Sequence, residues 1–166
     1  MPNRLIAGVV AGAAGTLALN VTTYLDMLLR GRPASKLPAR MAGRLADEAG
    51  ISLDFEGDSP AEAEGGQAAS PADNRREAVG ALLGYANGLG IGLGYGVVRL
   101  LLPSPPLWLA GGILGSAAMA ASDVPAARLG LTRPQDWTPA DWAADVIPHA
   151  AYGLVTALTF ELLREG

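Results

Sequence analysis

The chain has 166 residues, of which half are hydrophobic and 17% are charged, with a formal net charge of −4. No basic stripe is interleaved with aromatic residues, which argues against a nucleic-acid partner. Because the sequence has no cysteine, disulfides, thiolate metal sites and cysteine nucleophiles are excluded.

Long uncharged stretches alternate with polar ones along the chain. About 20 apolar residues span the hydrocarbon core of a bilayer. The pattern therefore predicts an all-α fold, a single four-helix transmembrane bundle (1–166), with helices over residues 4–29, 77–102, 106–124 and 141–164. The first stretch follows a basic start, as a signal peptide does, but it is long enough to remain in the membrane as a helix.

A polar loop, residues 30–76, follows the first predicted helix. Residues 35–51 predict a short amphipathic helix with Met41, Ala42 and Leu45 on one face. The basic residues that this helix offers to lipid headgroups are Lys36, Arg40 and Arg44. Residues 57–74 are rich in Gly, Ala, Ser, Pro and acidic residues, which predicts disorder.

The second predicted helix carries glycine at every fourth position, at Gly80, Gly84, Gly88, Gly92 and Gly96. In water each glycine would cost a helix about 1 kcal/mol relative to alanine. In lipid the helix persists, and glycine lets helices approach closely. The first and third predicted helices also carry glycines four residues apart, at Gly8 and Gly12 and at Gly111 and Gly115. The repetition predicts a bundle packed through glycine-rich faces, and association with a second copy or a membrane partner through such faces.

The glycines allow two other interpretations. Gly90 and Gly94 lie on a separate flank of the same helix, beside Asn87, and a glycine-lined pore is an alternative to packing. A nucleotide-binding loop at GLGIGLG is disfavoured because no strand precedes it.

The remaining segments orient the bundle. The turn PSPP (103–106) joins the second and third helices, which predicts an antiparallel hairpin. Thr138 followed by Pro139 predicts an N-cap with proline at the first helical position. Trp137 and Trp142 are expected at one membrane interface and Trp108 at the other.

Basic residues are distributed unevenly between the two sides. Nine of the twelve Lys and Arg residues fall in or beside the loops 30–76 and 125–140. The positive-inside rule therefore predicts that these two loops are cytoplasmic and that both termini are outside.

Polar side chains occupy one arc of the fourth helix, where Asp145 and His149 are one turn apart. An ionisable residue inside a membrane is a functional hypothesis by default. With polar residues of the first and third helices, the arc predicts a vestibule open toward the two long loops, formed by Asn20, Asp26, Asp123, Asp141, Asp145, His149, Tyr152 and Thr156. Glu161 is expected on the lipid-facing arc instead.

The vestibule leaves several chemistries open. Asp26, Asp123 and Asp141 also fit helix caps or interfacial positions. Asp145 and His149 fit a structural hydrogen-bonded pair, a proton or cation relay, or a metal site, although the usual zinc spacing is absent. No nucleophile elbow is present, so no catalytic residue and no cofactor are predicted.

The second half of the chain resembles the YagU-like family of small bacterial inner-membrane proteins. The matching features are a glycine-bearing helix, a Pro-containing turn with Leu107, Trp108 and Leu109 before LAGGILG, the GLT-x-P motif at 130–134, and DVIPHAAYGLVTALTFELLR with His149. The resemblance covers about residues 77–164. It implies a multi-spanning protein of a bacterial inner membrane and supplies no activity.

These observations predict a non-enzymatic membrane protein, an accessory subunit or scaffold that assembles through glycine-rich helix faces in a lipid bilayer. The first alternative is a small proton- or cation-conducting or transport protein that uses the vestibule around Asp145 and His149. The second is a membrane enzyme or a binder of lipid-like ligands in the same vestibule.

Overall fold

The computed structural model describes residues 3–55 and 70–165, and in these ranges the chain is all-helical with no strand. The elements, in chain order, are α1 (Arg4–Arg30), α2 (Leu37–Glu48), α3 (Pro71–Leu101), α4 (Leu107–Arg128), the short 3₁₀ helix η1 (Pro134–Asp136) and α5 (Pro139–Glu165). Four of them, α1, α3, α4 and α5, are long and apolar enough to cross a membrane. The predicted four-helix bundle is confirmed.

The start of α3 differs from the prediction. The helix begins at Pro71 because Ser70 and Asp73 form a capping box, in which the Ser70 hydroxyl accepts from the Asp73 amide at 3.1 Å. The prediction of disorder over 57–74 is therefore wrong for residues 70–74, and the rest of that segment lies outside the described residues. Ser70, whose residue type is common in loops, is therefore the N-cap of α3.

The short helix and the start of the last helix follow the sequence closely. α2 forms within the predicted range 35–51. At the start of α5, the Thr138 hydroxyl accepts from the Asp141 amide at 3.2 Å, and an Asp141 carboxylate oxygen accepts from the Thr138 amide at 2.9 Å. This reciprocal cap satisfies amides that the helix itself leaves unpaired.

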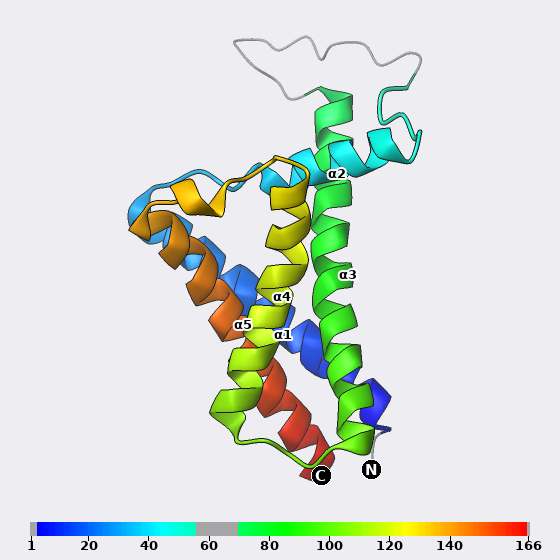
Figure 1. The fold of residues 1–166 in the computed structure, drawn as a ribbon, viewed down its shortest axis with the longest axis vertical. Coiled ribbons are helices and arrows are strands. Elements are labelled where there is room, and N and C mark those ends of the chain that lie inside the picture. The colour runs from blue at the N-terminus through cyan, green and yellow to red at the C-terminus, as the bar shows by residue number, and fades with distance from the viewer. Residues whose placement is uncertain (1–2, 56–69, 166) are drawn as a thin grey trace.

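The four long helices pack in the order α3, α1, α5, α4. Both described ends of the chain lie at the same end of the bundle as the turn between α3 and α4, and α2 lies at the opposite end (Figure 1). α3 and α4 are consecutive and antiparallel, yet they touch far less than α1 touches α3. Asn87 Nδ2 on α3 donates to the Ala118 carbonyl on α4 at 3.1 Å.

Glycine explains why α1 rather than α4 is the main partner of α3. A Cβ atom added at Gly8 would lie 2.5 Å from the Gly92 carbonyl oxygen, and one at Gly12 would lie 2.6 Å from that of Gly88. No real side chain fits at such distances, so the two backbones are in direct contact. Close backbone approach is the main source of helix attraction in lipid, where burying apolar surface contributes little.

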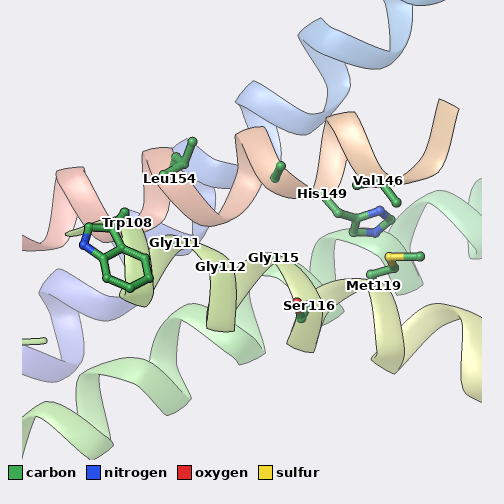
Figure 2. Close-up of a pocket in the computed structure, with 10 residues that line it drawn as sticks. Trp108, Gly111, Gly112, Gly115, Ser116, Met119, Val146, His149 and Leu154 are labelled. Carbon is green, nitrogen blue, oxygen red and sulfur yellow. The ribbon is translucent and has the colours of Figure 1, made fainter. Parts of the chain in front are cut away.

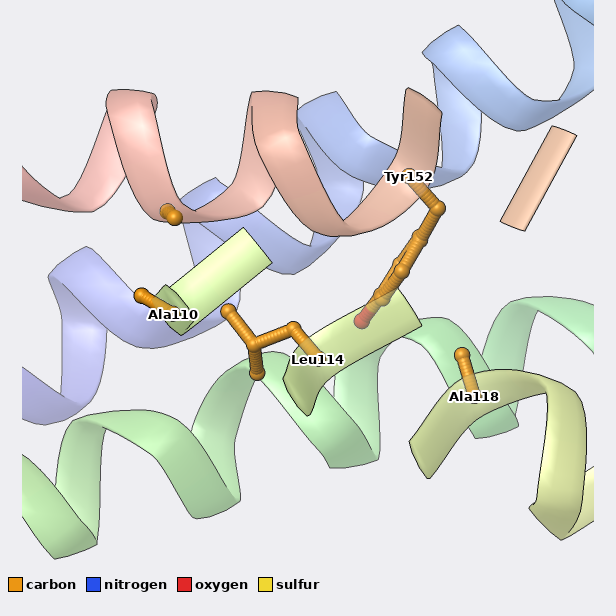
Figure 3. Packing of buried hydrophobic residues seen from close by; sticks show 5 residues of the cluster. Ala110, Leu114, Ala118 and Tyr152 are labelled. Carbon is orange, nitrogen blue, oxygen red and sulfur yellow. The ribbon is translucent and has the colours of Figure 1, made fainter. Parts of the chain in front are cut away.

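A second glycine contact joins α4 to α5. A Cβ at Gly115 would lie 2.6 Å from the His149 carbonyl oxygen, and one at Gly153 would collide with the Gly111 carbonyl oxygen. Between the two glycine contacts, the Tyr152 ring fills the centre of the bundle against Leu114 and Ala118 (Figure 3). The Tyr152 hydroxyl donates to the Gly88 carbonyl at 2.7 Å, so α5 is also tied to α3.

Candidate functional site

Three of the predicted vestibule residues come together between α4 and α5. Asp145 Oδ1 lies 3.5 Å from His149 Nδ1, and the same ring nitrogen lies 2.8 Å from the Asp145 backbone carbonyl. The Asp123 carboxyl group, on α4, is a neighbour of the Asp145 carboxyl group. We refer to Asp123, Asp145 and His149 as the acidic cluster.

The acidic cluster leaves polar atoms unpaired. Asp123 Oδ2 and Asp145 Oδ2 are buried, and neither receives a hydrogen bond from a donor in the described part of the chain. A buried carboxylate oxygen without a donor is costly. Two of them side by side form a place where a proton or a cation is attracted.

An open cleft of about 270 Å³ runs along the α4–α5 contact. Its wall is mostly glycine and apolar side chains, with Trp108 near one end and His149 and Met119 near the other (Figure 2). His149 is therefore shared: one nitrogen faces Asp145, and the ring also forms part of the cleft wall.

The structure places Asp26 and Asp141 elsewhere. The Asp26 carboxylate pairs with Arg30 at 2.6 Å and with Arg32 at 2.5 Å, and Asp141 caps α5. The Arg30 guanidinium also donates to the Ala140 carbonyl at 3.2 Å, which links the end of α1 to the start of α5. Both carboxylates are thus paired with groups near the helix ends, and they lie apart from the acidic cluster.

The other vestibule residues are distributed along the bundle. Tyr152 and Thr156 are 1% and 0% exposed and lie in its centre, where the Thr156 hydroxyl fills the space left by Gly15. Asn20, half-buried on α1, takes part in none of these contacts. The predicted open vestibule is, at the depth of Tyr152, a closely packed interior.

A second polar group, which the sequence analysis did not identify, lies at the terminal end of the bundle. The Arg99 side chain is only 3% exposed, and its Nη2 atom lies 3.5 Å from Glu161 Oε1. Glu161 Oε2 also pairs with Arg164 at 2.7 Å. Arg99 donates to Ser104 Oγ and to the Leu102 carbonyl, and Arg4 donates to the Arg99 carbonyl. We refer to Arg99, Ser104, Glu161 and Arg164 as the arginine cluster.

The expectation that Glu161 faces lipid is wrong. Its side chain is 22% exposed and lies against Arg99 of another helix. A wheel drawn for one helix cannot show which arc is covered, because the covering residue comes from the end of α3. The available signal was the spacing of Glu161 and Arg164, three residues apart on one helix face.

The predicted packing glycines fall into two sets. Those whose added Cβ would meet another helix are Gly8, Gly12, Gly80, Gly88, Gly92, Gly96, Gly111 and Gly115. At Gly84 an added Cβ would meet nothing within 4 Å, and the same holds for Gly90 and Gly94.

Within the described residues, no group of three or more His, Asp or Glu side chains is arranged to hold a metal ion.

Four glycine-packed helices, each with a long apolar stretch that holds few charged residues, define the class of this protein: it is a multi-pass, all-helical membrane protein. No protein family, curated protein or solved structure matches the chain. The resemblance to the YagU-like family stays a prediction.

Proposed function

We propose that the chain is a non-enzymatic membrane scaffold or accessory protein that associates with a second membrane helix, of another copy or of a partner protein, through α3. The observation that carries this proposal is the division of the glycines of one helix. A Cβ added at Gly88, Gly92 or Gly96 would collide with another part of the chain, whereas one added at Gly90 or Gly94, on the opposite side of the helix, would meet nothing within 4 Å.

The open glycines have the spacing that helix association in lipid requires. Ala86, Gly90 and Gly94 are four residues apart, so they form one small-residue stripe along α3. Such a stripe lets a second helix approach its backbone closely. We call these three residues the open face of α3.

The test is to fill the open face. The double variant Gly90→Leu, Gly94→Leu is expected to lose association, because the leucines hold the second helix away. Association is measured by energy transfer between labelled copies in vesicles and by crosslinking of a partner in cells. Gly84→Leu is the matched control, since Gly84 is equally open but lies on another arc. Equal association of the double variant and the parent would refute the proposal.

A second candidate function, passage of a proton or cation, is favoured by the unpaired oxygens of Asp123 and Asp145. Polar side chains continue from the acidic cluster through Tyr152 and Thr156 toward Glu161. In vesicles that enclose a pH-sensitive dye, Asp145→Asn is expected to lower proton flux and Asp26→Asn to leave it unchanged. A scaffold predicts no flux in the parent protein.

Accessibility separates the two candidates further. The chain has no cysteine, so single cysteines at positions 149, 152 and 156 can be labelled without background. A conducting path predicts labelling of all three by a membrane-impermeant thiol reagent. A scaffold predicts labelling of position 149 at most, since Tyr152 and Thr156 are packed in the interior.

We further propose a bacterial inner membrane as the location, with the loops 30–76 and 125–140 in the cytoplasm and the termini outside. The excess of Lys and Arg in and beside these loops supports this orientation. A reporter enzyme that is active only outside the cytoplasm, fused after the C-terminus, is expected to be active. An inactive fusion that is stably produced would reverse the orientation.

A further inference from the structure

The short helix α2 lies across α3, beside the bundle rather than within it (Figure 1). A Cβ added at Gly80 of α3 would lie 2.6 Å from the Pro38 carbonyl carbon, so the two backbones are in contact there. The charged residues at the start of α3 end at Glu77, just before this crossing, and the crossing lies at the beginning of the uncharged stretch 78–98. α2 therefore crosses α3 where the helix passes from water into the apolar part of a bilayer.

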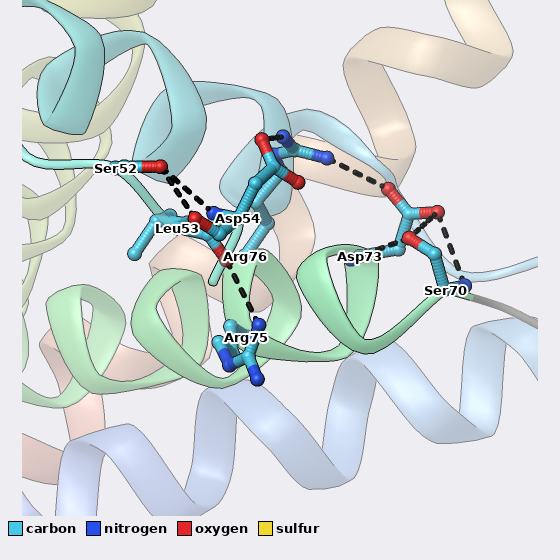
Figure 4. Close-up of polar contacts among 7 residues, drawn as sticks. All are labelled: Ser52, Leu53, Asp54, Ser70, Asp73, Arg75 and Arg76. Carbon is cyan, nitrogen blue, oxygen red and sulfur yellow. Dashed lines mark hydrogen bonds and ion pairs between the residues drawn. The ribbon is translucent and has the colours of Figure 1, made fainter. Parts of the chain in front are cut away.

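The position of α2 is held by the segment that follows it. Arg76 of α3 pairs with Asp54 at 3.2 Å and with Asp73 at 3.0 Å, and Arg75 donates to the Leu53 carbonyl at 3.0 Å (Figure 4). Arg75 also stacks over the Phe55 ring, 4.1 Å from its centre. α2 is thus fixed to α3 at the crossing and again through residues 53–55, and it presents its other faces in a set orientation.

At about 100° per residue, the residues of α2 divide into three arcs. The first, around Pro38 and the buried Ala42, faces α3. The second holds apolar side chains that the protein leaves partly or largely uncovered, Leu37, Met41 and Leu45. The third holds the exposed basic side chains Lys36, Arg40 and Arg44.

Within the described residues, the basic arc has little counter-charge. In the described part of the chain Lys36 and Arg40 form no ion pair, and Arg44 reaches only Glu48, at 3.6 Å across an exposed turn. An apolar arc beside a basic arc, at the depth of the bilayer surface, is the arrangement of helices that lie in the membrane interface.

We propose that α2 binds the headgroups of anionic phospholipids through Lys36, Arg40 and Arg44, with Leu37, Met41 and Leu45 set among the upper parts of the acyl chains. The charge selects the ligand: zwitterionic headgroups carry no net charge, whereas each basic residue near an anionic surface adds a separate attraction. This surface is distinct from the open face of α3, so it can hold whether or not the proposed function does.

The test uses the full-length protein and one fluorophore. Leu45→Cys provides a single attachment site on the apolar arc for an environment-sensitive dye. The labelled protein is reconstituted into vesicles of phosphatidylcholine with increasing fractions of phosphatidylglycerol. We expect the emission to shift to the blue and to become protected from an aqueous quencher as the anionic lipid increases, and added salt to reverse the change.

Charge removal provides the decisive comparison. In the same labelled background, Lys36→Gln, Arg40→Gln and Arg44→Gln, singly and together, are expected to raise the phosphatidylglycerol fraction needed for the shift. The apparent affinity should fall about fivefold per removed charge. Arg128→Gln with Arg133→Gln is the matched control, since both arginines are exposed and lie at the same end of the bundle but off α2.

Three results would overturn the proposal: emission that does not depend on lipid charge, a graded series in which no charge matters, or an equal loss in the control. A shift that occurs in phosphatidylcholine alone would show that the apolar arc inserts without headgroup selection, which also contradicts it. The single variants keep the test valid if the triple variant folds poorly.

Discussion

The two polar clusters lie toward opposite ends of the bundle and are built in opposite ways. In the arginine cluster, each carboxylate oxygen of Glu161 faces an arginine. The buried guanidinium of Arg99 has a carboxylate, a hydroxyl and a carbonyl as partners, and only its Nε atom finds no partner in the described part of the chain. In the acidic cluster, two carboxylates are neighbours, and each keeps a buried oxygen without a donor. In the first cluster a carboxylate joins the arginines of two helices, and in the second two carboxyl groups lie together with unpaired oxygens that attract a proton or cation.

The largest expected effect on stability comes from removing the carboxylate of the arginine cluster. Glu161→Gln leaves the charge of Arg99 buried without its counter-charge, and such a loss costs about 3–5 kcal/mol of stability. Thermal unfolding of the purified protein, followed by its helical signal, measures the change. Arg164→Gln is the control, because Arg164 is more exposed and its loss leaves Arg99 paired. Equal, small effects of both substitutions would remove the distinction between the two clusters.

The next largest effect on stability is expected at the glycine contact beside the arginine cluster. A Cβ at Gly96 would lie 2.5 Å from the Arg4 carbonyl oxygen, and the Arg4 side chain donates to the Arg99 carbonyl. Gly96→Ala should push α1 away and lower the free energy of unfolding by about 1–3 kcal/mol. Gly94→Ala, two positions away in open space, should leave it unchanged or slightly raised. A loss of stability at both positions would mean that helix propensity, rather than backbone contact, decides the effect.

The acidic cluster should respond with the opposite sign. Asp145→Asn removes one of two adjacent carboxyl groups, which repel each other when ionised, and supplies an amide donor for the unpaired oxygen of Asp123. The stability is therefore expected to rise, by about 1 kcal/mol, and the same unfolding measurement applies. Asp26→Asn removes a carboxylate that has two arginine partners and should not stabilise the protein. A destabilised Asp145→Asn variant would show that the acidic cluster stabilises the fold, as the arginine cluster is expected to do.

The smallest expected effect lies between the clusters. Tyr152→Phe removes only the hydroxyl that donates to the Gly88 carbonyl, while the ring keeps its packing. The expected loss is about 1 kcal/mol, the usual contribution of one hydrogen bond. Flux through the bundle, if the parent protein shows any, should also fall in this variant if Tyr152 belongs to the path. Unchanged flux would exclude the hydroxyl from that path.

Much of the fold could be predicted because its signals are local. Uncharged stretches long enough for a bilayer marked the four spans, and Thr138 with Pro139 marked the start of α5. The start of α3 was missed because Ser70 and Asp73 lie in a segment whose composition resembles disorder. In the site, the i, i+4 spacing of Asp145 and His149 was readable, whereas the approach of Asp123 from α4 depends on the packing of two helices.

The sequence by itself determined the class of the protein, its spans and the use of glycine for close helix contact, since these follow from hydropathy and from side-chain size. Only the tertiary structure decided which glycines are used and which stay open, and that Asp26 and Asp141 have partners apart from the acidic cluster. It also decided that Glu161 pairs with Arg99. The physical reason is that helical periodicity defines the arcs of one helix, but the arc that is covered depends on the crossing of a helix distant in the sequence.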